Sequence, residues 1–121
     1  MLARESLIKS LTEYQDFTGT HVAVVFDGQG GKLNEQTEPG GIQIFYSGSG
    51  QTADDVIERL VAKYGRENDI WVATDDLLEQ QTVITFGAQS LSSCGLRDLL
   101  DQTRADLARA LKARKRERKH G

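Results

Sequence analysis

Three short apolar runs of strand length alternate along the chain with segments of helical period, and this alternation limits the possible folds more than any other feature. The runs lie at residues 21–26, 42–46 and 70–74. The first and the third lack the polar and apolar alternation of a half-exposed strand, which indicates that both of their faces are covered. Helices and strands in alternation predict an α/β fold, with a mostly parallel sheet and helices on both faces.

Several segments between and beyond these runs carry helix signals. Apolar side chains recur at helical spacing over residues 3–18, and Gly19 ends that segment. Another helix is expected at about residues 76–86. A last helix, with leucines along one face, is expected from Ser92 onward.

Cap and turn residues mark the limits of the remaining segments. Thr52 can cap a helix, with Asp55 three residues later in the arrangement of a capping box, and Gly65 ends that helix. The polar, glycine-rich stretch at residues 28–41 is too long for a tight turn. We therefore predict a functional flap or a mobile loop between the first two strands.

Length and composition indicate one soluble domain. A chain of 121 residues suits a domain over residues 1–111, with a basic C-terminal tail at residues 112–121 that continues the last helix. No apolar run approaches the roughly 18 residues of a membrane span, and the polar first residues do not form a signal peptide. The single cysteine, Cys94, cannot form an internal disulfide. We expect a cytoplasmic protein with no membrane partner.

The basic tail contrasts with an otherwise acidic chain. The overall formal charge is −3, yet the last ten residues hold six basic side chains and one acid. Such a run is either a solvated helix end or a surface that contacts the phosphate backbone of RNA. The six candidate RNA-binding residues are Lys112, Arg114, Lys115, Arg116, Arg118 and Lys119.

Acidic residues follow the predicted strands. Asp27, Asp75 and Asp76 come directly after strands, and Asp54 stands in the first turn of a helix that follows another. Ligands of parallel sheets bind beyond the carboxyl ends of the strands, so we expect these side chains to converge at one edge. Gathered carboxylates raise one another's pKa, and such clusters usually bind a cation or carry out proton chemistry. A divalent metal ion is the simplest occupant.

Each of these acids also has a structural interpretation. Asp54 in a first helical turn is stabilised by the helix dipole by about 0.3 to 1 kcal/mol. Asp75 and Asp76 can begin the next helix, and Asp27 can be a loop acid. Convergence of three separate segments on one edge is what favours the metal site.

Three segments resemble the YacP-like NYN domains of the PIN-like ribonuclease superfamily. They are Val-Ala-Val-Val-Phe-Asp at 22–27, Thr-Ala-Asp-Asp-Val-Ile-Glu-Arg-Leu at 52–60, and Val-Ala-Thr-Asp-Asp at 72–76 with Leu-Glu-Gln at 78–80. The glycine and alanine at 87–88 and the helix after Ser92 fit the closing pattern of the family. The resemblance covers nearly the whole chain.

The resemblance implies phosphodiester hydrolysis at a site that holds Mg²⁺ or Mn²⁺. Asp54 and Asp76 match the aspartates of the family's Thr-Ala-Asp and Thr-Ser-Asp elements, and Asp27 matches the acid that closes the second strand. These three are the implied catalytic residues. Asp75 stands where the family commonly has a small polar residue, and it completes the set of candidate metal ligands.

One departure from the family concerns its first, central strand. Members usually open with a strand that ends in Asp-Gly-Tyr-Asn, whose aspartate belongs to the metal site, whereas this sequence opens with the helix that would follow it. Asp27 and Gly28 come after that helix and do not replace the motif. We expect either an amino-terminal truncation, or a gap that another segment or subunit fills.

The sequence therefore predicts a metal-dependent endoribonuclease whose partner is RNA. The alternative is a noncatalytic RNA-binding or assembly module that keeps the nuclease fold. A Mg²⁺ phosphotransfer enzyme on a related sheet is a third class, and no Asp-x-Asp nucleophile motif supports it. The sequence leaves open a homo-oligomer or a larger ribonucleoprotein.

Overall fold

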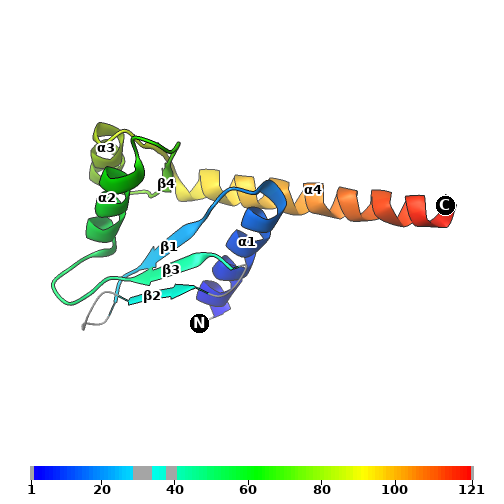
Figure 1. Ribbon diagram of the computed structural model, residues 1–121, viewed down its shortest axis with the longest axis horizontal. Helices are drawn as coiled ribbons and strands as arrows, with labels where there is room; N and C mark the ends of the chain where they lie inside the picture. Colours follow the sequence, from blue (N-terminus) through cyan, green and yellow to red (C-terminus); the bar gives the residue numbers. More distant parts are fainter. Residues whose placement is uncertain (1, 29–33, 38–40, 121) are drawn as a thin grey trace.

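The computed structural model describes residues 2–28, 34–37 and 41–120. Helices and strands alternate along this part of the chain, which confirms the predicted α/β class (Figure 1). In chain order the elements are α1 (Leu2–Thr18), β1 (Ala23–Phe26), β2 (Asn34–Thr37), β3 (Gln43–Tyr46), α2 (Ala53–Tyr64), β4 (Trp71–Ala73), α3 (Leu77–Thr85), β5 (Gln89–Leu91) and α4 (Ser93–His120).

The strands form two separate small sheets. In the first, β1 and β3 are parallel, and β2 pairs antiparallel with the other side of β3. In the second, β4 and β5 are parallel. The two parallel pairs agree with the mostly parallel arrangement expected from the sequence. The expected fold class is confirmed in this form.

Two of the strands were not predicted from the sequence. Residues 28–41 were expected to be a flap or loop, yet Asn34–Thr37 form β2, and residues 29–33 and 38–40 lie outside the described part of the chain. The sequence of this strand has no apolar pattern that would reveal it. The other missed strand, β5, is only three residues long.

The main core joins α2, α3, β4 and the residue before β5. Its buried members are Val61, Val72, Val83 and Ala88, and Ile57 and Ile70 pack against them. Val61 and Val83 are among the most deeply buried side chains of the described residues. Because Val61 comes from α2 and Val83 from α3, this cluster holds the two helices against each other.

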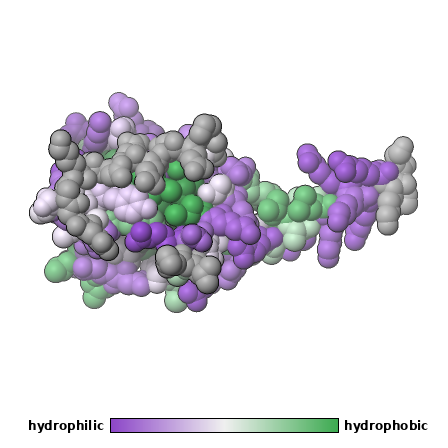
Figure 2. Space-filling model, turned by 90° about the horizontal axis from the view of Figure 1, so that it is seen from below, coloured by the Kyte–Doolittle hydropathy of each residue, from purple (hydrophilic) through white to green (hydrophobic). Residues whose placement is uncertain are grey.

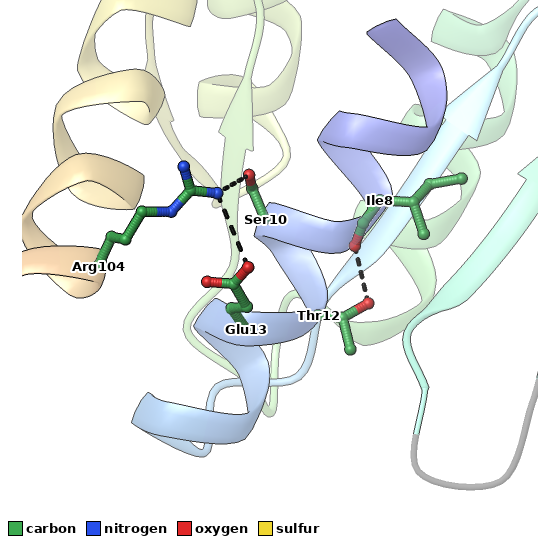
Figure 3. Close-up of polar contacts among 5 residues, drawn as sticks. All are labelled: Ile8, Ser10, Thr12, Glu13 and Arg104. Carbon is green, nitrogen blue, oxygen red and sulfur yellow. Dashed lines mark hydrogen bonds and ion pairs between the residues drawn. The ribbon is translucent and has the colours of Figure 1, made fainter. Parts of the chain in front are cut away.

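The amino-terminal helix packs against the first sheet and against α4. The guanidinium of Arg4 lies 4.4 Å from the centre of the Phe26 ring at the end of β1. Arg104 of α4 donates a 3.0 Å hydrogen bond to Ser10 Oγ and lies 3.7 Å from Glu13 Oε1 (Figure 3). The Arg104 side chain is largely exposed, so its contacts orient the helices more than they stabilise them.

The second half of α4 projects away from the remaining elements (Figure 1). The helix continues to His120, so residues 112–120 are helical. Among the residues described, no helix combines the length and the apolar character needed to cross a membrane.

A prediction concerns Gly28, which lies where β1 meets the segment after β3. Its N–H donates a 2.9 Å hydrogen bond to Ser47 Oγ, and a Cβ at this position would stand 1.9 Å from the Ser47 carbonyl oxygen. Ser47 is buried and cannot withdraw. We expect Gly28→Ala to lower the free energy of unfolding by about 2 kcal/mol or more, measured by urea denaturation.

Gly95→Ala is the matched control for this substitution. Gly95 lies in α4, and the atoms nearest to a Cβ there would be at 3.5 Å, which is ordinary contact. Alanine should raise helix stability at that position by up to about 1 kcal/mol. Equal effects of the two substitutions would contradict the close approach of Gly28 and Ser47.

Candidate functional site

Asp27 joins the end of β1 to the start of α2. Its Oδ1 accepts a 2.7 Å hydrogen bond from the backbone N–H of Ala53, the first residue of α2. The carboxyl end of the first strand and the amino end of the helix that carries Asp54 are therefore adjacent. A direct hydrogen bond thus joins two of the segments that were expected to converge.

The start of α2 is a complete capping box, as predicted. Thr52 Oγ1 accepts from the Asp55 N–H at 3.2 Å, and Asp55 Oδ2 accepts from the Thr52 N–H at 3.0 Å. The two neighbouring acids therefore have different roles. Asp55 caps the start of the helix, whereas Asp54, one position earlier, makes no capping bond of this kind. The cap fixes the direction in which α2 presents its first turn.

The adjacent residues Asp75 and Asp76 bind the starts of two different helices. Asp76 Oδ1 accepts from the N–H groups of Leu78 at 2.9 Å and Glu79 at 3.4 Å, and so caps α3. Asp75 reaches α4 instead, where Oδ1 accepts from the Ser93 N–H at 2.8 Å and Oδ2 from Ser93 Oγ at 2.5 Å. These bonds hold the pKa of the Asp75 carboxyl below its usual range.

Glu79 is the most unusual acid of the described residues. Its side chain is only 4% exposed, and its Oε2 has no hydrogen-bond partner among them. Asp54 and Glu58, which are half-buried on α2, are the carboxylates that interact with its carboxyl group. Burial first, and then these two carboxylates, raise the pKa of Glu79 to about 8.

The cluster of Asp54, Glu58 and Glu79 is energetically unfavourable when all three carboxyl groups are ionised. Two unit charges 4 Å apart repel by about 4 kcal/mol at an effective dielectric constant of about 20. Asp54 and Glu79 each stand in a first helical turn, where the helix dipole returns roughly 0.3 to 1 kcal/mol. The helix dipoles alone therefore do not offset the repulsion between the carboxylates. A bound proton or a cation must offset it.

Sequence reasoning missed Glu58 and Glu79, although both had a signal. Glu58 follows Asp54 by four residues, so the two side chains share one face of α2. Glu79 precedes Val83 by four residues and thus lies on the buried face of α3. An acid on the apolar face of a helix is rarely buried without a function or a partner.

The four predicted ligands do not form one group. Within residues 2–28, 34–37 and 41–120, no three side chains of Asp, Glu, His or Cys are arranged to hold a metal ion. The segments that carry Asp27, Asp54 and Asp76 are nevertheless connected. Asp27 accepts from the N–H of Ala53, which precedes Asp54, and Asp76 accepts from the N–H of Glu79. The carboxyl groups of Glu79 and Asp54 interact in turn. Carboxylate oxygens are the donor type that Mg²⁺ and Mn²⁺ take, and the buried oxygen without a partner in the described residues belongs to Glu79.

The predicted RNA-binding side chains lie at the far end of α4. Lys112, Arg114, Lys115, Arg116 and Arg118 are exposed, while Lys119 is helical and its side chain lies outside what the structure describes. The projecting end of the helix is strongly hydrophilic (Figure 2). The described basic side chains are therefore exposed to solvent on the projecting end of the helix.

Comparison with known proteins identifies the family. The YacP-like NYN domain matches residues 1–121. The chain belongs to the YacP-like NYN domain family. This is a PIN-like nuclease family, and the match confirms the resemblance found in the sequence. Family members generally depend on a metal ion.

Relatives from Bacillus subtilis are similar in sequence and in structure. The relative called "Uncharacterized protein YacP" is 35% identical to this chain over 88 residues, which cover 71% of this chain and 52% of that protein. A crystal structure of Rae1 (YacP) matches with a TM-score of 0.79 and 31% identity, covering 98% of this chain and 70% of that one. A crystal structure of a mutant of Rae1 (YacP) matches with a TM-score of 0.78 and 28% identity, covering 93% of this chain and 66% of that one. The chain spans about half the length of YacP.

A prediction follows from the raised pKa of Glu79. Between its ordinary value of 4.5 and about 8, the folded protein keeps the Glu79 proton while the unfolded chain releases it. Stability should therefore fall as pH rises through this window. In EDTA, Glu79→Gln should increase the free energy of unfolding at pH 8 by about 1 to 3 kcal/mol and change it little near pH 4.5, measured by urea denaturation.

Glu67→Gln serves as the control, because Glu67 is an exposed acid outside the helices. This variant should follow the parent protein at both pH values. If Glu79→Gln gave the same stability difference at pH 4.5 as at pH 8, the Glu79 carboxyl would not be held protonated by its surroundings.

Proposed function

We propose that this chain is the catalytic domain of a metal-dependent endoribonuclease, which hydrolyses RNA phosphodiester bonds at the acidic site between α2 and α3. The observation that carries the proposal is the meeting of Asp54 with a buried, unpartnered Glu79 at the starts of two helices. Membership of a PIN-like nuclease family supports the same reaction class. We place the enzyme in the cytoplasm, with RNA as its partner.

The implied metal ion is Mg²⁺ or Mn²⁺, which Asp27, Asp54 and Asp76 would hold. When bound, such an ion supplies positive charge for the scissile phosphate and its leaving oxygen. Asp76 keeps Oδ2 available while Oδ1 caps α3, and Asp27 likewise uses only Oδ1 for Ala53 in the hydrogen bonds described. Asp75 uses both oxygens for Ser93, so we assign it the supporting role of fixing α4 beside the site.

A noncatalytic RNA-binding module remains the second candidate. The observation that favours it is the absence, among the described residues, of three groups arranged to hold a metal ion. Such a module would bind RNA through the basic end of α4 and would not cut it. Assembly into a homo-oligomer or a larger ribonucleoprotein stays a prediction for either candidate.

The function is tested by removing single charges without removing helix caps. Asn is as good an N-cap as Asp, so Asp76→Asn should keep α3 capped while losing the negative charge. We expect Asp76→Asn and Asp54→Asn to abolish Mn²⁺-dependent cleavage of single-stranded RNA by the full-length protein. Cleavage is followed on a labelled RNA by gel electrophoresis, and folding by circular dichroism.

Asp101→Asn is the control, because it removes one exposed acid of α4 away from the helix starts. It should cut RNA at the parent rate. Undiminished cleavage by Asp76→Asn would remove this residue from the mechanism. RNA binding without cleavage by the parent protein, across Mg²⁺ and Mn²⁺, would favour the noncatalytic module.

A second experiment examines the basic tail. Replacing the six basic residues from Lys112 to Lys119 by Gln should weaken RNA affinity and flatten its dependence on salt, because fewer counterions are released from the RNA. The measurement is the slope of the logarithm of affinity against the logarithm of salt concentration, by fluorescence anisotropy. An unchanged slope would assign the tail to a solvated helix end.

A further inference from the structure

A hollow of about 320 Å³ lies between α1 and α4, and its lining is partly apolar and partly acidic. The lining residues are Glu13, Asp16, Phe17 and Leu107. Phe17 is 42% exposed, and Asp16 is exposed as well. Glu13 contacts Arg104, whereas Asp16 forms no ion pair among the described residues. This face of the molecule therefore offers apolar surface with negative charge beside it.

The face of α4 that lines the hollow changes from apolar to basic along the helix. Leu111 follows Leu107 by four residues and is 51% exposed. Arg114 and Lys115 follow Leu111 by three and four residues, so their exposed side chains continue the same face. The projecting part of α4 is hydrophobic near the body and hydrophilic toward its end (Figure 2). An apolar stripe on a projecting helix is a surface suited to another protein element.

We propose that this face of α4 pairs with the same face of a second copy of the chain, with the two α4 helices antiparallel. Such a pair has a two-fold axis, uses one surface on both copies and is closed. Leu111 of each copy then packs on Leu107 and Phe17 of the other. The proposal goes beyond the proposed function and does not depend on it.

The antiparallel register determines which residues come level with each other. When Leu111 of one copy lies over Leu107 of the other, positions farther along one helix meet positions earlier along its partner. Arg114 and Lys115 of one copy therefore come level with residues 103–104 of the other. A parallel pair would instead place the two basic ends together, where like charges repel.

The acids of α1 lie at this level of α4. Glu13 contacts Arg104, and Glu13 and Asp16 both line the hollow beside Leu107. The basic side chains of one copy therefore approach the acids of the other, which gives the pair complementary charge at both ends. The same acids repel a phosphate backbone, and the leucines offer it no hydrogen-bond donor. A second copy thus fits this face better than RNA does.

The experiment measures the mass of the full chain, freed of nucleic acid, by sedimentation equilibrium over a range of protein concentrations. One helical stripe is a small interface, so we expect a reversible dimer with an affinity in the micromolar range or weaker. The double variant Glu13→Lys with Asp16→Lys should weaken dimerisation by roughly tenfold or more, and so should Arg114→Glu with Lys115→Glu. An equimolar mixture of these two variants should dimerise again, because opposite charges then face each other at both ends.

A matched pair of leucine substitutions tests the apolar stripe. Leu111→Gln should weaken dimerisation, whereas Leu78→Gln, which changes a leucine of α3 that is 74% exposed, should dimerise as the parent does. Both side chains are exposed, so neither substitution opens a cavity in the core. Circular dichroism verifies that each variant is folded.

The mixture of the two charge variants is decisive, because a loss caused by misfolding is not rescued by mixing. A mixture that stays monomeric would overturn the proposal, as would a parent protein that is monomeric at every concentration. Assemblies larger than two chains would contradict the closed two-fold pair. Equal effects of Leu111→Gln and Leu78→Gln would overturn the assignment of the contact to this face of α4.

Discussion

The packing of α2 against α3 is the contact on which the site depends. Val61 and Val83 drive it by burying apolar surface, at roughly 1.5 to 3 kcal/mol for each side chain. That gain forces Glu79, one turn before Val83, into the same interface. The desolvation of one carboxyl group is thus offset by apolar burial in the next turn of the same helix. A cluster of acids is maintained by hydrophobic contacts that lie directly beside it.

Hydrogen bonds at helix starts give this interface its orientation. The Ala53 N–H to Asp27, the Thr52 and Asp55 capping box, and the Asp76 cap all fix first turns, which are the turns that carry Asp54 and Glu79. Each bond to a carboxylate contributes about 1.5 to 3 kcal/mol net when well formed. The acids that cap, Asp55 and Asp76, are therefore different residues from Asp54 and Glu79, which interact across the two helices.

Much of this fold could be predicted from local sequence signals. Helical periodicity, Gly19, and the Thr52 and Asp55 pair located the helices to within a few residues, because propensity and capping are local effects. The strands β2 and β5 were missed, since a polar edge strand and a three-residue strand are defined by their partners in space. The alternation of these local signals also predicted the α/β class, which the structure confirms.

The site was less predictable, for a reason visible in Asp75 and Asp76. Both follow β4 directly, and nothing in the sequence states that one turns to Ser93 and the other to the start of α3. Glu79 was recognisable only as an acid on an apolar face, because its partners Asp54 and Glu58 come from a helix more than 20 residues earlier. Sequence spacing identifies which residues share a helix face, and only tertiary packing identifies which faces meet.

The contact between Asp75 and Ser93 also sets the distance between the acidic site and the basic tail. It fixes the start of α4 beside the residue that caps α3, and from Ser93 a helix rises about 1.5 Å per residue, or about 28 Å to Lys112. Charges are screened over about 8 Å at physiological salt. The cations of the tail therefore cannot neutralise the carboxylates around Glu79, whose repulsion must be relieved locally. For the same reason, RNA contact by the tail, as proposed above, would be a phosphate contact separate from the acids.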